Sequence, residues 1–374
     1  MRTTMPAVER QPGAEAPMSE APPLIQLLDA QGVRQQHPVE SWIADVDDEL
    51  IASLYEDLVI CRRIDAEATA LQRQGELGLW APMQGQEAAQ LGSARALRND
   101  DFVFSSYREH AVAYARGVDL TGIIKMYRGT ANSGWDPYSV NMAIPAIIIG
   151  AQALHATGYA MGLKHEGLDA AAITYFGDGA TSQGDIAEAM VFATSYQVPV
   201  VFFCQNNHWA ISEPVALQSR TPIADRAAGY GMPSVRVDGN DVLAVMAVTR
   251  EALHRARSGG GPSFIEAVTY RMGPHTTSDD PSRYVDPFER EEWAGKDPIL
   301  RVEAYLRASG ALSEEFEQQV SARADEVARR LRAGALGLPE PGPLSLFDHV
   351  YAEPHRGLQR QRSQYAAYLE GFES

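Results

Sequence analysis

The sequence has 374 residues, of which 45% are hydrophobic and 22% charged, an ordinary globular composition. Its 49 acidic and 32 basic side chains give a formal net charge of -17, which disfavours nucleic acids and anionic membranes as partners. No apolar stretch reaches the roughly 18 residues that a membrane span requires. The N-terminal residues lack the apolar core of a signal peptide, so we expect a cytoplasmic protein.

The first part of the chain is predicted to be mainly helical. Residues 1–45, rich in Pro, Gln, Ala and Glu, are expected to form a mobile N-terminal arm. Apolar residues at helical spacing predict a helix over 47–74, and further helices are expected over 86–97 and 110–128. Between the last two, the short apolar run 101–105 is typical of a strand end.

The middle of the chain alternates strands with helices. The expected strands cover 170–176, 199–205, 234–237 and 262–270, and the expected helices cover 184–196 and 242–257. Such a succession predicts an α/β fold, a parallel sheet with helices on both faces. Beyond Pro298 the chain is predicted to be helical again. We therefore expect one α/β domain over 46–335, with helical N- and C-terminal extensions, and a tail over 336–374.

Two polar motifs follow neighbouring strands of this predicted sheet. A Gly-Asp-Gly motif at 177–179 ends one strand, and an Asn pair at 206–207 ends the next. Because ligands of parallel sheets bind beyond the carboxyl ends of the strands, we expect Asp178 and Asn207 to face one another there. Their oxygens are hard ligands of the kind that Mg²⁺ prefers. The glycines would let the backbone approach a phosphate, and the helix start that follows would offer free N–H groups.

These motifs and their surroundings resemble a known family. The segments YFGDGATSQGD, FFCQNNHWAIS, YGMPSVRVDGNDV and FIEAVTYRMGPHTTSDDPSRY are similar to those of the α subunits of 2-oxo acid dehydrogenases, which use thiamine diphosphate. The resemblance covers about 55–351 and implies a thiamine-diphosphate-binding fold. It implies that Mg²⁺ is held by Asp178, Asn207 and the backbone carbonyl of Trp209, a position where the family usually has Tyr.

Three further segments fit the same resemblance. It implies that Arg108, in the Tyr107-Arg108 pair, contacts the diphosphate. It also implies that the backbone at Ile147 and Ile149 holds the aminopyrimidine ring, although composition alone indicates a core strand over 147–149. It also implies that His275 is an acid/base or anion-stabilising residue near the reacting carbons. The residues thereby implied to bind thiamine diphosphate are Tyr107, Arg108, Ile147, Ile149, Gly177, Asp178, Gly179, Ala180, Asn207 and His275.

The resemblance also implies an activity and partners. Such a subunit takes part in the oxidative decarboxylation of a small-molecule 2-oxo acid and in acyl transfer to a lipoyl group on a second component of the complex. The sequence contains no second set of strands to supply the Glu that protonates the aminopyrimidine ring. A separate β subunit in an α2β2 assembly is therefore implied. The quoted segments look closer to branched-chain 2-oxo acid dehydrogenases than to pyruvate dehydrogenases.

Three alternatives remain open at this stage. The first is the same chemistry on pyruvate or acetoin. The second is a non-catalytic scaffolding subunit that has lost its cofactor, and the third is a Mg²⁺-dependent phosphotransferase with Asp178 as nucleophile. The segment 129–141 departs from the family pattern, so the sequence leaves open whether it contacts the substrate.

Overall fold

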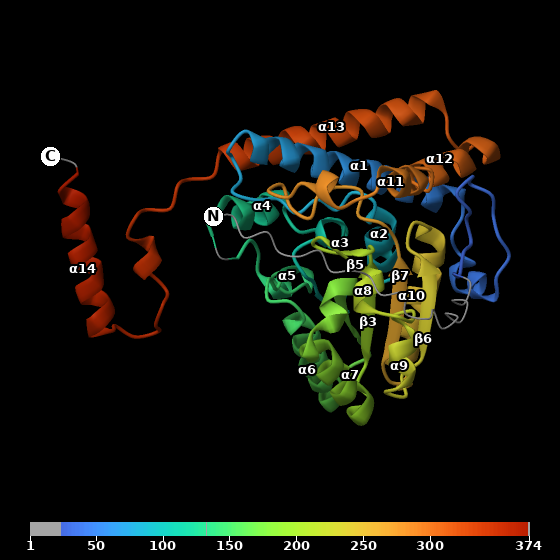
Figure 1. The fold of residues 1–374 in the computed structure, drawn as a ribbon, viewed down its shortest axis with the longest axis horizontal. Helices are drawn as coiled ribbons and strands as arrows, with labels where there is room; N and C mark the ends of the chain where they lie inside the picture. The colour runs from blue at the N-terminus through green and yellow to red at the C-terminus, as the bar shows by residue number, and fades with distance from the viewer. Residues whose placement is uncertain (1–23, 132, 373–374) are drawn as a thin grey trace, which may run out of the picture.

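A computed structural model describes residues 24–131 and 133–372 of the chain. Its centre is a five-stranded parallel sheet with the strand order β1-β2-β3-β7-β6 (Figure 1). The strands are β1 (Phe102–Phe104), β2 (Ala172–Gly177), β3 (Val200–Asn206), β6 (Ser234–Asp238) and β7 (Ser263–Val268). A small antiparallel pair follows β3 in the chain, β4 (Trp209–Ala210) with β5 (Glu213–Pro214).

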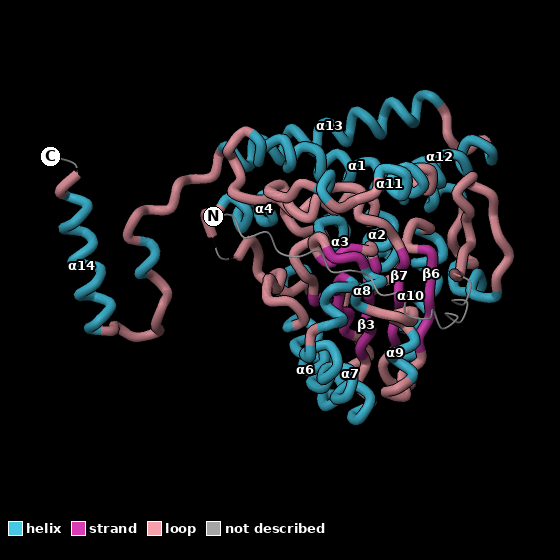
Figure 2. The backbone as a smooth tube through the Cα atoms, viewed as in Figure 1, coloured by secondary structure: helices cyan, strands magenta, loops and turns pink. Residues whose placement is uncertain are grey.

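Helices cover both faces of the sheet, which confirms the predicted α/β class (Figure 2). One face packs against α6 (Ala151–Glu166) and α7 (Gly184–Tyr196), and the other against α10 (Val242–Arg257), which in turn contacts α2 (Glu87–Arg95). Farther from the sheet lie α1 (Asp48–Arg73), α12 (Pro298–Ser309) and α13 (Glu314–Leu336). The shorter α-helices are α3 (His110–Ala115), α4 (Leu120–Arg128), α5 (Pro137–Val140), α8 (Val215–Gln218), α9 (Asp225–Ala228) and α11 (Pro287–Ala294), and the 3-10 helices are η1 (Pro38–Ile43), η2 (Asp178–Ser182), η3 (Pro281–Arg283) and η4 (Ser345–Phe347).

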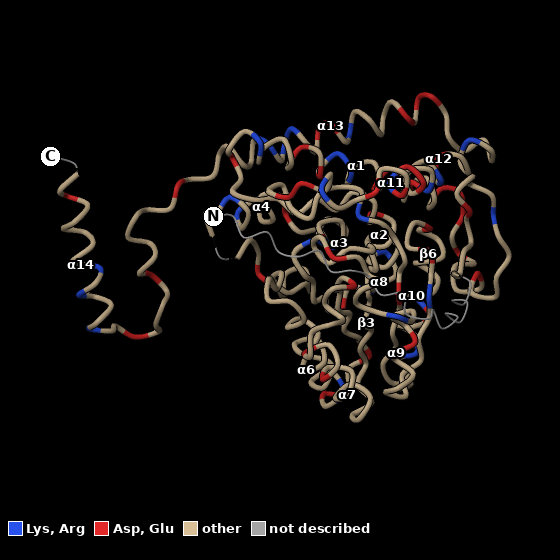
Figure 3. Tube along the Cα trace, viewed as in Figure 1, with Lys and Arg blue, Asp and Glu red and all other residues tan. Residues whose placement is uncertain are grey.

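Alternation along the strands explains why the sheet is covered on both faces. In β2, Ile173 and Tyr175 join the hydrophobic cluster formed with α10 and α1, whereas Ala172 and Phe176 join the cluster formed with α6 and α7. Successive side chains of a strand point to opposite faces, so two apolar sets in one strand require two covering layers. Charged residues are frequent on the outer helices α1, α11 and α13 and sparse along the strands (Figure 3).

The prediction of a single helix over 110–128 is wrong. The segment forms two helices, α3 and α4, separated by a short turn. Gly117 adopts a φ of 78° in that turn, a left-handed conformation that glycine takes without strain. The Asp119 side chain then accepts the Thr121 backbone N–H at 2.7 Å and caps the start of α4.

The segment after residue 23 differs from the mobile arm that we expected over 1–45. Residues 1–23 lie outside the described part of the chain, but Ile25 pairs with Val237 at the edge strand β6. Leu27 and Leu28 are completely buried, and their backbone N–H groups both donate to Asp241 at 2.6 Å. A carboxylate far away in the sequence therefore fixes this segment to the sheet edge, a contact that local composition does not reveal.

The predicted tail over 336–374 begins where α13 ends. After η4 it forms one further helix, α14 (Arg356–Glu370), which stands away from the rest of the molecule (Figure 1). No residue of α14 is buried, and Tyr368 and Phe372 expose 61% and 72% of their surface. Among the described residues, no helix combines the length and the apolar character that a membrane crossing would need.

Candidate active site

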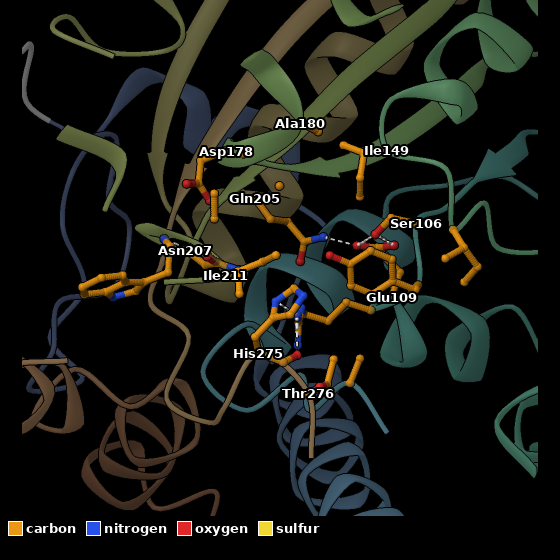
Figure 4. Close-up of a pocket in the computed structure, with 18 of the residues that line it drawn as sticks. Ser106, Glu109, Ile149, Asp178, Ala180, Gln205, Asn207, Ile211, His275 and Thr276 are labelled. Carbon is orange, nitrogen blue, oxygen red and sulfur yellow. Dashed lines mark hydrogen bonds between the residues drawn. The ribbon is translucent and has the colours of Figure 1, made fainter. Parts of the chain in front are cut away.

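A cavity of about 420 Å³ lies beyond the carboxyl ends of β2 and β3 (Figure 4). The edge where parallel strands end is the usual ligand site of such sheets, as predicted. Every residue that the sequence analysis selected for a metal or cofactor lines this one cavity. They are Tyr107, Arg108, Ile147, Ile149, Gly177, Asp178, Gly179, Ala180, Asn207, Trp209 and His275.

Asp178 lies at the start of η2, directly after β2, and is 1% exposed. Its Oδ2 accepts a hydrogen bond from Gln218 at 3.2 Å, whereas its Oδ1 is buried with no hydrogen-bond partner in the protein. Burial raises the pKa of this carboxyl to about 6, although backbone N–H groups, including that of Asn207, act in the opposite direction. A buried carboxylate oxygen that lacks a hydrogen-bond partner and borders a cavity is a candidate ligand for a cation.

The two glycines of the motif at 177–179 differ in their steric surroundings. A Cβ on Gly179 would lie 2.6 Å from the Cβ of Ala210, so only glycine lets β4 pack this closely against η2. That contact brings Trp209 to the cavity wall. A Cβ on Gly177 would meet only the Gln205 carbonyl, at 4.0 Å, so no close contact requires glycine at this position.

The three oxygens predicted to hold Mg²⁺ come from adjoining elements. Asn207 follows β3, and its Oδ1 accepts the Trp209 backbone N–H at 3.2 Å. The Trp209 carbonyl accepts from Arg271 at 3.3 Å. The described residues contain no group of three or more His, Cys, Asp or Glu side chains suited to a metal. One carboxylate, one amide and one carbonyl nevertheless fit a cation that completes its shell with water and phosphate oxygens, and the orphaned Asp178 Oδ1 supports this fit.

His275 lines the cavity away from Asp178 (Figure 4), and Arg108, which also lines it, contacts this histidine. The Arg108 guanidinium donates to the Pro82 and His275 carbonyls and lies 3.1 Å from His275 Nδ1. Because a guanidinium only donates, Nδ1 must accept and the ring proton must sit on Nε2. Burial, followed by the charges of Arg108 and Arg271, lowers the pKa of His275 to about 4. His275 is thus a neutral imidazole with one N–H to offer at neutral pH.

The run at 147–149 is a loop before α6, not the core strand that its composition indicates. Ile147 and Ile149 line the cavity and expose 62% and 41% of their surface, and Ile148 exposes 74%. Gly150, with a φ of 90°, ends the loop and starts the helix. An apolar loop this exposed beside a cavity is typical of a surface that another molecule covers.

Several lining residues were not selected from the sequence. Glu109, Gln86 and Gln205 are buried and polar, and Leu79 and Tyr127 add apolar wall. Glu109 directly follows Arg108 in the chain, which is the only local signal that could have identified it. Within the segment 129–141, none of the described residues lines the cavity.

Comparison with known proteins identifies the family. The family model described as "Dehydrogenase E1 component" matches residues 55–331, which is most of the chain. The chain belongs to this family. Membership confirms the resemblance read from the two polar motifs and implies thiamine diphosphate as the cofactor.

Two kinds of relative within the family are similar over nearly the whole chain. The 3-methyl-2-oxobutanoate dehydrogenase subunit alpha of Mycobacterium tuberculosis is 48% identical over 326 residues, covering 87% of this chain and 89% of that protein. The pyruvate dehydrogenase E1 component subunit alpha of Staphylococcus epidermidis is 40% identical over 344 residues, covering 91% and 92%. The Staphylococcus aureus counterpart is 39% identical over the same length.

Proposed function

We propose that this chain is the α subunit of a branched-chain 2-oxo acid dehydrogenase. It acts in the oxidative decarboxylation of a branched 2-oxo acid and passes the acyl group to a lipoyl group on a second component. The observation that carries the proposal is the single cavity that gathers every predicted cofactor residue in a chain of this family. The 48% identity to a 3-methyl-2-oxobutanoate dehydrogenase subunit supports the branched substrate.

Several polar groups of the cavity have a role in this proposal. Asp178, Asn207 and the Trp209 carbonyl would hold Mg²⁺, and Arg108 would contact the diphosphate. When bound, thiamine diphosphate supplies the nucleophile and the electron sink for decarboxylation. His275 would offer its Nε2–H to a negatively charged oxygen of the substrate, and Arg108 holds the ring in the tautomer that makes this possible.

The apolar wall is consistent with a branched acyl chain. Leu79, Ile147 and Ile149 line the cavity and have no polar side-chain atoms. A hydrophobic pocket discriminates by about 1–3 kcal/mol per missing carbon, which corresponds to roughly 10–200-fold. Pyruvate, which lacks the branched side chain, would leave part of this wall without contacts.

Exposed apolar surface supports a β subunit as partner. Ile148 and Ile211 stand at or near the cavity and expose 74% and 57% of their surface. No residue of α14 is buried, and its Tyr368 exposes 61% of its surface. Contiguous exposed apolar residues mark interaction surfaces, so we infer that a β subunit completes the cavity and that the assembly is α2β2.

Substrate profiling tests the proposal. The chain, co-expressed with its β subunit and supplied with Mg²⁺ and thiamine diphosphate, is offered 3-methyl-2-oxobutanoate, 4-methyl-2-oxopentanoate and pyruvate beside an artificial electron acceptor. We expect kcat/KM for the branched acids to exceed that for pyruvate about tenfold or more. A preference for pyruvate would retain the chemistry and reject the substrate. A folded, cofactor-loaded complex that turns over none of the three would reject the activity.

A further inference from the structure

A chain of buried hydrogen bonds runs along one wall of the cavity from Asn207 to Glu109. The Asn207 Nδ2 donates to Gln86 Oε1 at 2.7 Å, and Gln86 Nε2 donates to Gln205 Oε1 at 3.0 Å. Gln205 Nε2 then donates to Glu109 at 2.7 Å (Figure 4). We call these four side chains the amide relay. Ser106 Oγ donates to the far oxygen of Glu109 at 2.8 Å and closes the relay.

The relay has a fixed direction. Each amide has one accepting oxygen and one donating NH2 group, and the Glu109 oxygen that faces Gln205 accepts. With Glu109 at one end, Gln205 must turn its NH2 group toward the carboxylate and its oxygen toward Gln86. Gln86 must then turn its oxygen toward Asn207, which therefore directs its own NH2 group into the relay.

Gln90 fixes the same direction independently. Its Oε1 accepts the backbone N–H of Ala111 at 3.1 Å, so its NH2 group faces the other way, 3.2 Å from Gln205 Oε1. A backbone N–H cannot reverse its polarity, and the Gln205 orientation is thereby determined from two sides. The oxygen and nitrogen of an amide are distinguished by their hydrogen bonds, and the backbone N–H of Ala111 makes this distinction for Gln90.

We propose that Gln86 is a positioning residue for a divalent cation and that Glu109 and Gln90 together fix the polarity through which it acts. The relay engages the NH2 group of Asn207, so the amide oxygen is turned out of the relay, where it accepts the Trp209 backbone N–H at 3.2 Å. In this proposal the same oxygen and the unpartnered Oδ1 of Asp178 would both face the cation. A flipped Asn207 would offer N–H donors in place of that oxygen ligand and would repel the metal.

The burial of the relay supports this role. Gln86 and Gln205 are each 1% exposed and Glu109 is 4% exposed, so none can exchange its partner for bulk water. In such surroundings a hydrogen bond retains its orientation, and hydrogen-bonding partners of metal ligands typically change metal affinity by about 10–100-fold when removed. The inference rests on the proposed metal role of Asp178 and Asn207.

The test measures metal binding without catalysis. Mn²⁺ is titrated into the full α subunit assembled with its β subunit and saturated with thiamine diphosphate, and free Mn²⁺ is followed by electron paramagnetic resonance. We expect Gln86→Met, which keeps the length but removes both polar atoms, to weaken Mn²⁺ binding about 10–100-fold. Gln86→Glu, which in its protonated form accepts from Asn207 and donates to Gln205, is expected to restore binding to within a few-fold of wild type.

A matched control separates positioning from general stability. Glu266 is 1% exposed and accepts from the neighbouring Asn206 at 2.8 Å, but it is outside the relay. Glu266→Gln is expected to lower the melting temperature and to leave Mn²⁺ binding within twofold of wild type. Should Gln86→Met fail to fold, Gln205→Met interrupts the relay one step farther away and is expected to weaken binding about tenfold.

The outcomes distinguish this inference from the proposed function. Wild-type protein that binds no Mn²⁺ would reject the metal site itself. Wild-type binding together with unchanged binding in a folded Gln86→Met or Gln205→Met protein would overturn the relay and leave the metal site intact. Equal loss in Gln86→Met and Gln86→Glu would also overturn it, because polarity would then be irrelevant.

Discussion

Two buried polar clusters lie at the same edge of the sheet and have opposite characters. One follows β2 and β3 and includes Asp178; the other follows β6 and includes Asp238 and Asp241. Both contain an Asp beside a Gly at a strand end, and burial raises the pKa of Asp178 and of Asp241 to about 6. Neither the sequence pattern nor the pKa therefore separates a ligand site from a structural one.

The partners of the carboxylate oxygens make the distinction. Both oxygens of Asp241 are occupied, since one accepts from Leu27 and Leu28 and the other from Leu243 and Ala244. Asp238 is similarly engaged, by Gln26, Asn240 and Arg301. Asp178 alone of the three keeps an oxygen with no partner in the protein. A buried carboxylate whose two oxygens both accept hydrogen bonds has a structural role, whereas one with an unpartnered oxygen is a candidate ligand site.

The largest expected effect comes from Asp178→Ala. Removing a direct metal ligand should weaken Mg²⁺-dependent thiamine diphosphate binding by more than about 100-fold, beyond the effect of losing an indirect partner. Isothermal titration calorimetry of the assembled protein, with and without Mg²⁺, measures this. The melting temperature in the absence of ligands should fall little, because the substitution removes a buried carboxyl that has one unpartnered oxygen and a single side-chain hydrogen bond, from Gln218 at 3.2 Å. Unchanged cofactor binding would remove Asp178 from the metal site.

Asp241→Ala is the matching change in the cluster that follows β6. It should lower the stability of the protein and leave cofactor binding nearly unchanged. It removes the cap of α10 and leaves the N–H groups of Leu27 and Leu28 without an acceptor. We expect a loss of about 3 kcal/mol in the free energy of unfolding, measured by urea denaturation. Cofactor affinity should stay within a few-fold of wild type at temperatures where the protein is folded. Strongly weakened binding by folded protein would show that the two clusters are coupled.

The contrast between these clusters also shows what the sequence could reveal. The Gly-Asp-Gly motif and the Asn pair each follow a strand, and parallel strands bring their carboxyl ends together, so local pattern sufficed to place Asp178 beside Asn207. His275 and Ile147 required the resemblance, because a lone loop histidine or an apolar run has no local signature of a site. The α/β class followed from alternation alone.

Features that depend on distant partners could not be predicted. Gln86 meets Gln205 across 119 residues, and no periodicity connects them. Leu27 is held by Asp241, although its own neighbourhood has the composition of an arm. The break between α3 and α4 was missed because one glycine within a helical pattern does not show whether it will adopt a positive φ.

The smallest expected effect concerns the protonation of a buried histidine, His110. His110 is 5% exposed, stacks on Trp80 with ring centroids 4.0 Å apart, and has Nε2 3.0 Å from the Ala81 carbonyl. Burial, with a smaller contribution from the charge of Arg108, lowers its pKa to about 3. Like Asp241, this histidine is surrounded by protein, so we expect its ring to stay unprotonated in the folded state at mildly acidic pH.

A lowered pKa makes the folded protein less stable in acid. Between pH 6.5 and pH 5 the unfolded chain takes up a proton at His110 and the folded chain does not, so the free energy of unfolding should fall by about 2 kcal/mol from this group. Urea denaturation at the two pH values should show a smaller fall in His110→Phe, which keeps the stacked ring. His165→Asn, at an exposed position of α6, controls for loss of a histidine as such. An equal fall in the free energy of unfolding of wild type and His110→Phe would mean that the buried ring accepts the proton. Burial within the protein would then not distinguish groups that are unavailable to a ligand from groups that can bind one.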